Sequence, residues 1–476
     1  MVSQESQVSQ VSQVSQVSQV SQVSQDSQVS QESQVSQVSQ VARLGYYRIL
    51  LLTVIFTCIL LSTIFLNSTP YKADNLILSS TEDVNSQGYP GSFVQLVHPE
   101  ASNTSYCNFN YGFPYDLKYE VADIAFGPEQ GKKSQYRILY NVVEAKLDGS
   151  LPRITYATHV TGDFVNYILE LVRYWDGLIS VAAFVPDTDV ALVLEQINQY
   201  CYCLPGMSRV SIHLVYPKKL PPSRKDIYFP KPTECKIVDS SKLSTYRSFD
   251  EQVVYPINVC RNAARTAALT ENVLVSDIQL IPSENLARNF CKMMEIYNYA
   301  ECPNKVYVVP IFEVEVTENI PRTKKQLVQL VREGKAIYFH KLVCSHCQRF
   351  PGIESWMLTN PGNVIKPMLV TRREVPYNRW EPIFIGTKDE PLYNENMSWE
   401  GLQDKMLQVL EMCLIGYKFV VLDGAFLVHW PGMKKTKTQD GETWRYEFIK
   451  QNEEEYDRIV KNLSMRYTLN PQCKLN

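Results

Sequence analysis

The strongest chemical signal in the sequence is a hydrophobic run, residues 273–280, that carries a single carboxylate, Asp277. A charged side chain among apolar neighbours needs a partner. Ligands of open α/β sheets collect at the carboxyl ends of the strands, so Asp277 is a candidate ligand for a divalent metal that bridges nucleotide phosphates. The alternative is ordinary turn chemistry, because Pro282 and Ser283 follow closely.

A polar stripe lies just upstream of this run, at helical spacing i, i+3, i+4 and i+7. Its members are Asn258, Arg261, Asn262 and Arg265. Two guanidinium groups on one helix face would suit phosphates or a carboxylate, which predicts a donor-binding role. The alternative is a solvated face of an amphipathic helix.

A second apolar run, residues 419–428, ends in His429 and is followed by Lys434 and Lys435. A neutral imidazole is a good ligand for Mn²⁺, and nearby lysines would attract diphosphate oxygens. The alternative is a structural histidine.

A compact H-x3-C-x-H-C cluster comprises His340, Cys344, His346 and Cys347. Zinc is one reading, although adjacent His346 and Cys347 cannot readily bind one ion together. The other reading is a Cys344–Cys347 disulfide, or pairing of both cysteines elsewhere.

Alternating helices and strands must position these residues. Helical spacing begins after Asp163, a candidate N-cap, and ends at Gly177; further helices are expected at 188–200, 255–269 and 324–333. Strands are expected at 178–185, 210–215 and 272–281. This order predicts an α/β sheet with crossover helices.

The N-terminal region reads as a membrane anchor. Residues 1–48 form the expected tail, in which the x-Ser-Gln triplets of residues 2–40 should be disordered; a binding or phosphorylation tail is the alternative. Uncharged residues 49–66 would span about 27 Å as a helix. Arginines precede the span, so we expect a cytoplasmic N-terminus, with a stem at 67–105 and a lumenal domain at 106–476. A cleaved signal peptide is the competing reading. Sequons follow the span at Asn67, Asn103, Asn396 and Asn462.

The composition limits the classes of function that the protein can have. With 45% hydrophobic residues the chain can build a large core, and a formal charge of -3 offers no electrostatic footprint for nucleic acid. The 12 cysteines favour an oxidising compartment. Cys58 falls in the apolar span, so an odd number remains; one thiol is free or pairs between chains, which leaves a homo-oligomer open.

Residues 106–433 resemble the beta-1,4-glucuronyltransferase family and the second catalytic domain of the LARGE-type transferases. The resemblance rests on the order of its motifs: Trp175-Asp176-Gly177, Tyr255-Pro256-Ile257-Asn258 with Arg261-Asn262 and Arg265, Ser276-Asp277 with Pro282-Ser283, Val309-Pro310-Ile311-Phe312-Glu313, Glu381-Pro382, and Phe426-Leu427-Val428-His429.

This resemblance implies a GT-A type mixed sheet with flanking helices and a Golgi type II membrane enzyme. It implies Mn²⁺-dependent, inverting transfer of glucuronic acid from a UDP-sugar to a xylose-terminated O-mannose-type glycan. Asp277 and His429 become metal ligands. An enzyme carboxylate should deprotonate the acceptor hydroxyl, and we expect Glu395, with Glu381 and Asp404 as alternatives.

The sequence departs from the family pattern at two places. The family's Asp-x-Asp or Asp-x-Glu becomes Asp277-Ile278-Gln279, so the third metal-binding position is a neutral amide and metal affinity should fall. The family's Tyr-Asp-Glu-Arg-Phe stretch becomes residues 393–397, without the arginine and aspartate. These changes leave an alternative function, a catalytically degenerate Golgi protein that binds a glycan or stabilises a partner.

Overall fold

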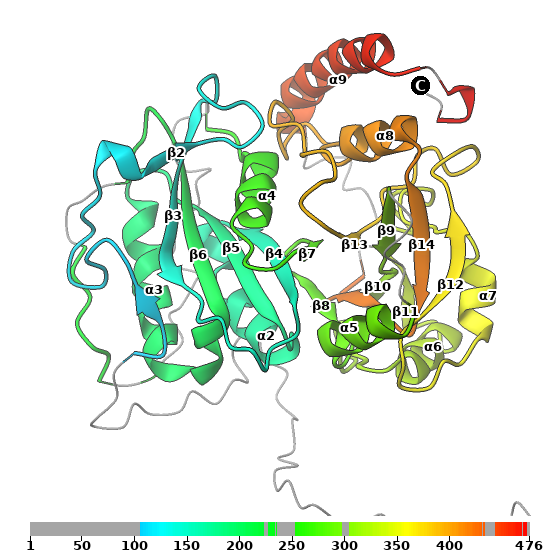
Figure 1. Cartoon of the computed structure of the whole chain (residues 1–476), viewed down its shortest axis with the longest axis horizontal. Coiled ribbons are helices and arrows are strands. Elements are labelled where there is room, and N and C mark those ends of the chain that lie inside the picture. Colours follow the sequence, from blue (N-terminus) through cyan, green and yellow to red (C-terminus); the bar gives the residue numbers. More distant parts are fainter. Residues whose placement is uncertain are drawn as a thin grey trace, which may run out of the picture. The chain divides into compact units, whose positions relative to one another are not determined.

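The computed structural model describes residues 105–222, 227–233, 235, 253–297, 304–430, 432–433, 443–468 and 470–473, which all lie in one compact unit. Its main element is an 11-stranded mixed sheet in the order β1-β3-β6-β5-β4-β7-β13-β9-β14-β12, with β2 paired to β3 (Figure 1). The strands are β1 (Asn108–Phe109), β2 (Ile124–Phe126), β3 (Tyr136–Glu144), β4 (Ile154–Val160), β5 (Leu178–Phe184), β6 (Val210–Pro217), β7 (Asn272–Val275), β9 (Lys305–Val308), β12 (Lys366–Thr371), β13 (Phe384–Gly386) and β14 (Lys418–Asp423).

The centre of this sheet is parallel. β6, β5, β4 and β7 run in one direction, whereas β13 lies antiparallel between β7 and β9. Every residue of β4 and β5 is buried, as expected for strands covered on both faces. The carboxyl ends of β4 and β7 therefore meet at one edge.

A smaller sheet has the order β11-β10-β15-β8. Its strands are β8 (Leu280–Pro282), β10 (Ile311–Val314), β11 (Ala336–Tyr338) and β15 (Leu427–His429). β15 pairs parallel with β10 and antiparallel with β8.

Helices cover the main sheet, and α9 lies beside α8 at the top of Figure 1. They are α2 (Tyr167–Tyr174), α3 (Asp189–Cys203), α4 (Ile257–Thr266), α5 (Leu286–Tyr297), α6 (Lys324–Arg332), α7 (Ile353–Leu358), α8 (Met406–Ile415) and α9 (Tyr446–Arg466). The predicted helices at 188–200, 255–269 and 324–333 are confirmed as α3, α4 and α6, and the predicted strands at 178–185 and 210–215 as β5 and β6.

The start of α2 differs from the prediction. Residues Gly162–Phe164 form a 3-10 turn, and the α-helix begins only at Tyr167, after Asn166. Asp163 lies within that turn and accepts a hydrogen bond from the hydroxyl of Thr161, so it is not the N-cap of α2. Asp176 has a similar local task, because its carboxylate accepts the N–H groups of Ala287 and Arg288 at 3.0 Å, at the first turn of α5.

The single strand predicted at 272–281 is wrong, because the chain turns at Asp277. The N–H of Leu280 donates to the Asp277 carbonyl at 3.0 Å. The buried Tyr156 hydroxyl donates to the carbonyls of Asp277 at 3.1 Å and Leu280 at 2.8 Å, which fixes the turn. The run therefore divides into β7 in the main sheet and β8 in the small one.

The run that ends in His429 divides in the same way, into β14 and β15. Gly424 adopts φ +84° between them, where a Cβ would lie 2.3 Å from the Val364 carbonyl oxygen, so only glycine fits. Because β8 and β15 pair, His429 lies opposite Leu280. Both candidate metal-ligand runs are thus broken at the junction of the two sheets.

The polar stripe of α4 is buried, so neither a solvated face nor a free phosphate-binding face describes it. Asn258 donates to the carbonyls of Asn394 and Asp404, both at 2.8 Å. Asn262 donates to the Tyr393 carbonyl at 2.8 Å. These bonds hold the segment 387–404 against the parallel sheet.

Arg265 also binds segment 387–404 to α4. Its guanidinium donates to the carbonyls of Glu390 at 2.6 Å and Pro391 at 2.9 Å, and lies 3.4 Å from the Glu390 carboxylate. Both side chains of this ion pair are 3% exposed, so each charge depends on the other.

Four disulfides link the described cysteines: Cys107–Cys201, Cys203–Cys235, Cys344–Cys347 and Cys413–Cys473. The Cys344–Cys347 pairing confirms one of the two alternatives for the cysteine-histidine cluster. Cys260 and Cys291 are free thiols.

No helix within the described ranges is long and apolar enough to cross a membrane. The expected repeat tail 1–48, the expected span 49–66, and the expected stem up to residue 104 lie outside the described residues.

We predict that Arg265→Met lowers the free energy of unfolding by about 3–5 kcal/mol, because it leaves the Glu390 carboxylate buried without its cation. Urea unfolding followed by circular dichroism measures the change. Arg332→Met, at an exposed position of α6, is the matched control. A loss of equal size in the control would contradict this account, and adding Glu390→Gln should recover part of the stability.

Candidate active site

The carboxylate of Asp277 is the centre of a charged cluster beyond the carboxyl ends of β4 and β7. Its Oδ1 accepts from Arg261 Nη2 at 3.0 Å and lies 3.2 Å from His159 Nε2, while its Oδ2 accepts from Lys405 Nζ at 3.1 Å. Arg261 also pairs with Asp404. The Asp277 side chain is 30% exposed and that of Arg261 only 2%, so the cluster is rooted in the core and open on the Asp277 side.

The two cations decide the charge of both carboxylates. Burial alone would raise the pKa of Asp277, but Lys405 and Arg261 outweigh it and hold that pKa well below the usual value. Burial likewise opposes ionisation of Asp404, and the charge of Arg261 lowers its pKa again. Two carboxylates are therefore balanced by two cations, and the cluster stays ionised at neutral pH.

His159 was not identified from the sequence. It lies at the end of β4, with Nδ1 2.6 Å from the Tyr255 hydroxyl and Nε2 toward Asp277. Burial lowers its pKa, so the ring is neutral. Because Asp277 can only accept, we assign the proton to Nε2, and Tyr255 donates to Nδ1. A histidine at the end of a buried strand was the available signal.

Lys405 was also missed as a cluster member, although its neighbour Asp404 was a candidate. It is the N-cap residue of α8 and its side chain is 15% exposed. Its ammonium is therefore the accessible cation of the cluster, at a helix N-terminus where the helix dipole also favours anions.

Two predicted metal ligands, Gln279 and His429, lie directly before β8 and at the end of β15, strands that pair with each other, but their side chains make different contacts. His429 is opposite Leu280, so Gln279 is one position away from its partner in the β8–β15 ladder. The His429 ring donates Nδ1–H to the Gly432 carbonyl at 3.3 Å. Gln279 donates its amide to the Tyr167 hydroxyl at 3.4 Å, which leaves its amide oxygen as an acceptor.

The chemistry of these residues suits a divalent cation only weakly. Gln279 and His429 supply neutral ligand atoms, whereas hard cations prefer anionic oxygens. Asp277, the acid of the set, already accepts from Lys405 and Arg261. Lys434 and Lys435 lie outside the described residues.

Of the three carboxylates expected to act as base, Glu395 is tied to the backbone. It accepts the N–H groups of Glu129 at 3.0 Å and Gln130 at 3.1 Å, and the Asn262 amide at 3.1 Å. It thereby closes the loop before β3 onto α4, and its carboxylate has little capacity left for a substrate proton. Asp404 is occupied by Arg261.

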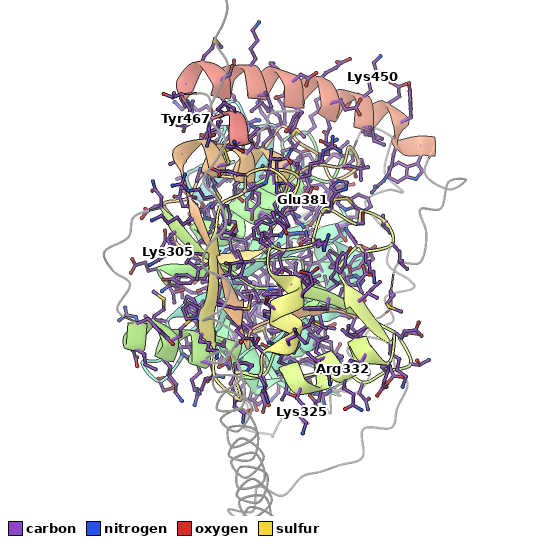
Figure 2. The ribbon with its side chains drawn as sticks, turned by 90° about the vertical axis from the view of Figure 1, so that its right-hand side faces the viewer. Lys305, Lys325, Arg332, Glu381, Lys450 and Tyr467 are labelled. Carbon is purple, nitrogen blue, oxygen red and sulfur yellow. A yellow bond between two sulfur atoms is a disulfide. The ribbon has the colours of Figure 1, made fainter. Side chains whose placement is uncertain are left out.

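Burial also raises the pKa of Glu395, although its hydrogen bonds oppose the rise. The shift of Glu381 is the large one. Burial raises its pKa to about 7, the charge of Asp404 adds to the rise, and Lys405 opposes it. Glu381 therefore lies within electrostatic range of Lys405, Asp404 and Arg261. In the view of Figure 2 its label falls near the centre of the outline, whereas Lys325, Arg332 and Lys450 lie nearer the rim. A carboxyl group that titrates near neutral pH suits proton transfer.

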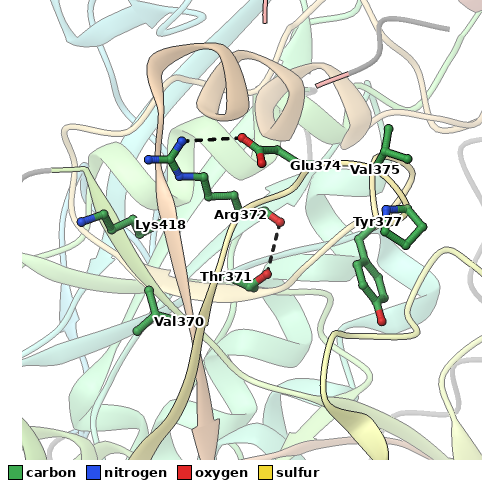
Figure 3. Close-up of a pocket in the computed structure, with 8 residues that line it drawn as sticks. Val370, Thr371, Arg372, Glu374, Val375, Tyr377 and Lys418 are labelled. Atoms are coloured by element: carbon green, nitrogen blue, oxygen red, sulfur yellow. Dashed lines mark hydrogen bonds and ion pairs between the residues drawn. The ribbon is translucent and has the colours of Figure 1, made fainter. Parts of the chain in front are cut away.

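Two hollows lie away from this cluster. One, of about 410 Å³, lies at the end of β12 and the start of β14; its lining includes Lys418, Tyr377 and Arg372, which pairs with Glu374 at 3.6 Å (Figure 3). The other, of about 540 Å³, lies beside α8 and α9. Neither is lined by Asp277, Lys405 or Glu381.

The charged cluster lies at the carboxyl ends of parallel strands, the edge at which open α/β sheets bind their ligands. A family model described as "Glycosyl-transferase for dystroglycan" matches residues 153–468, and the chain belongs to this family. It is a UDP-sugar-dependent glycosyltransferase.

The chain is similar to beta-1,4-glucuronyltransferase 1 from Danio rerio, with 29% identity over 319 residues, 62% of this chain and 72% of that protein. Its similarity to the Homo sapiens protein of the same name is 27% over 320 residues, 64% of this chain and 74% of that protein. Xylosyl- and glucuronyltransferase LARGE1 from Homo sapiens is 22% identical, over 58% of this chain and 31% of that protein. These findings confirm the family expected from the motifs.

Among solved structures, GalNAc-T7 with UDP, GalNAc and Mn2+ is 8% identical, with a TM-score of 0.33, over 66% of this chain and 51% of that chain. This similarity is too low to support an inference about fold or metal.

We predict that Gln279→Asp strengthens Mn²⁺ binding about tenfold, because an anionic oxygen replaces an amide oxygen in the ligand set. Isothermal titration calorimetry with Mn²⁺ in the presence of UDP measures the affinity. Gln279→Asn keeps a neutral amide and should not gain affinity. Equal binding by the wild type and Gln279→Asp would show that position 279 does not contact the cation.

Proposed function

We propose that the protein transfers glucuronic acid from UDP-glucuronic acid to a glycan hydroxyl, with inversion at the anomeric carbon. The observation that carries the proposal is the near-neutral Glu381 carboxyl beside the Lys405–Asp277–Arg261 cluster. The printed names of the glucuronyltransferase relatives support the choice of sugar and a β-linked product. The glucuronic acid of UDP-glucuronic acid is α-linked to the diphosphate, so a β-linked product requires inversion at its anomeric carbon.

Inversion needs one displacement and one base. The Glu381 carboxylate takes the proton of the acceptor hydroxyl while that oxygen forms a bond to the anomeric carbon. The bond from this carbon to the UDP oxygen breaks at the same time, and UDP leaves with the electron pair. Its negative charge then needs stabilisation by fixed cations.

Among the residues that the structure describes, we propose Lys405 as the one that meets the diphosphate, because its ammonium is the accessible cation of the cluster. Arg261 contributes through its charge while it holds Asp277 and Asp404 in place. This revises the predicted donor-binding set, since Asn258, Asn262 and Arg265 bind segment 387–404 instead. Lys434 and Lys435 stay predicted phosphate ligands.

We retain Mn²⁺ in the proposal as a weakly held cofactor. Gln279 and His429 would hold it together with phosphate oxygens of UDP, which supply the negative charge that Gln279 lacks. When bound, it would neutralise charge on the leaving diphosphate.

We further propose a GT-A type fold, supported by the mixed sheet with β13 antiparallel between β7 and β9. The proposed acceptor is a xylose-terminated O-mannose-type glycan, supported by the family description and by the printed name of LARGE1. The proposed location is the Golgi membrane, in type II orientation through residues 49–66. Four disulfides suit its oxidising lumen.

We expect Glu381→Gln to lower kcat by about 100- to 10,000-fold, because the amide cannot accept the acceptor proton. Transfer from UDP-glucuronic acid to a β-xyloside measures it. In the wild type, kcat should fall as the pH drops through about 7, where Glu381 becomes protonated. Turnover by Glu381→Gln at the wild-type rate would refute the assignment.

Folding provides the control for this variant. The folded-state pKa of Glu381 is raised, so its contribution to stability is present at low pH and is lost as the pH rises through about 7. Glu381→Gln should therefore unfold at pH 8 at no lower a temperature than the wild type. Glu354→Gln, at a surface carboxylate that is 68% exposed, should keep full activity.

The proposed lumenal location predicts N-glycans at the sequons. Asn396 and Asn462 are exposed, so an oligosaccharide can be attached without unfolding. Treatment of the secreted domain with peptide N-glycosidase F should increase its electrophoretic mobility, and Asn462→Gln should remove one part of that shift. A mobility unchanged by the glycosidase would contradict the location.

A further inference from the structure

The main chain of Glu381 is held on both sides by the segment that follows Cys344. Its N–H donates to the Cys347 carbonyl at 2.8 Å, and its own carbonyl accepts from the side chain of Gln348 at 2.7 Å. Gln348 is 5% exposed, so this second bond is shielded from water. The position of Glu381 therefore depends on where residues 347 and 348 lie.

The Cys344–Cys347 disulfide fixes that turn. The Cys347 N–H donates to the Cys344 carbonyl at 3.1 Å, and the Cys344 N–H donates to the His340 carbonyl at 2.7 Å. The turn is at the surface, with both cysteines partly exposed and Ser345 and His346 between them exposed. A small thiol can therefore reach this disulfide.

This disulfide can do little for global stability. A disulfide stabilises a protein chiefly by restricting the unfolded chain, and the effect grows with the length of the closed loop. Cys344 and Cys347 are 3 residues apart, whereas Cys107 and Cys201 are 94 apart. Its main effect is local, on the turn that holds Glu381.

We propose that the Cys344–Cys347 disulfide positions Glu381, and that its reduction by a thiol lowers transfer activity without unfolding the protein. The inference rests on the proposed function of Glu381 as base. Reduction transfers two electrons from a dithiol, which is itself oxidised to a disulfide, and leaves two thiols at Cys344 and Cys347. Cys347 and Gln348 then lose their fixed register, and the Glu381 carboxyl becomes more accessible to water.

Increased hydration of the Glu381 carboxyl should change the pH dependence of kcat, and this change can be measured. Burial is the main cause of the raised pKa of Glu381, so loosening its support should move that pKa down toward the ordinary glutamate value. The acidic limb of the pH profile of kcat should then shift to lower pH. Partial unfolding of the protein would instead lower the activity at every pH and would not move the acidic limb of the profile.

The same cysteines could serve a metal only in reduced form. The Cys344, His346 and Cys347 ligand atoms lie within 4.8 Å of one another, as a zinc site requires. A disulfide has no thiolate to offer, so zinc binding and the positioning role exclude each other.

The experiment compares Cys344→Ser/Cys347→Ser with the wild type and with Cys203→Ser/Cys235→Ser, a control at the far disulfide. We expect kcat of the first variant to fall about tenfold, with KM for UDP-glucuronic acid within about twofold and the acidic limb shifted down by about one pH unit. The control should keep the limb of the wild type. Mild treatment of the wild type with a dithiol, monitored by alkylation and mass spectrometry, should reproduce the variant.

Several outcomes would overturn the proposal. A wild-type kcat and pH limb in Cys344→Ser/Cys347→Ser would show that the disulfide does not position Glu381. Activity of the reduced wild type that rises on addition of Zn²⁺ would replace the disulfide by a metal site. If the wild type itself transfers no sugar, the proposed function fails, and hydrogen exchange at the Glu381 amide still decides whether the disulfide holds that segment. Equal exchange in variant and wild type would exclude it.

Discussion

The buried guanidinium of Arg261 is the interaction on which the candidate site depends. It extends from α4 in the first half of the fold to Asp277 beyond β7 and to Asp404 just before α8. Removing this buried cation would leave Asp404 without its partner and Asp277 with Lys405 alone, which destabilises the fold or raises the pKa of the carboxyl groups. The same residue therefore joins distant parts of the chain and keeps two acids ionised beside Lys405.

The breaks in two strands explain why the site lies where it does. β7 and β14 belong to the main sheet, but their continuations, β8 and β15, pair with each other in the small sheet. Asp277 and Gly424 occupy these two breaks. Residues that are more than a hundred positions apart, Leu280 and His429, thereby become partners in one ladder, and Gln279 directly precedes it. The turn at Asp277 is fixed by the Tyr156 hydroxyl rather than by a local sequence signal.

Sequence patterns predicted the helices and strands better than they predicted the contacts between side chains that are distant in the sequence. Apolar periodicity located β5, α3, β6, α4 and α6, because burial of one face or of a whole strand leaves a regular trace. Continuous apolar runs hid the breaks at Asp277 and Gly424, because apolar residues continue through both. Polar residues at helical spacing could not distinguish a solvated face of α4 from one buried against segment 387–404, since the partner is about 130 residues away. The motifs identified the family because their order survives, and the family was confirmed. His159 and Lys405 were missed because their partners are distant in sequence.

The Cys413–Cys473 disulfide has a practical consequence for anyone who handles the protein. It ties the residues near the C-terminus to α8, the helix whose first turn presents Lys405. An affinity tag or reporter fused directly after Cys473 would be connected through this disulfide to the helix that begins at Lys405. A fusion at the other end of the folded unit, ahead of Ser105, has no such connection to α8. It is connected to α3 instead, through the Cys107–Cys201 disulfide.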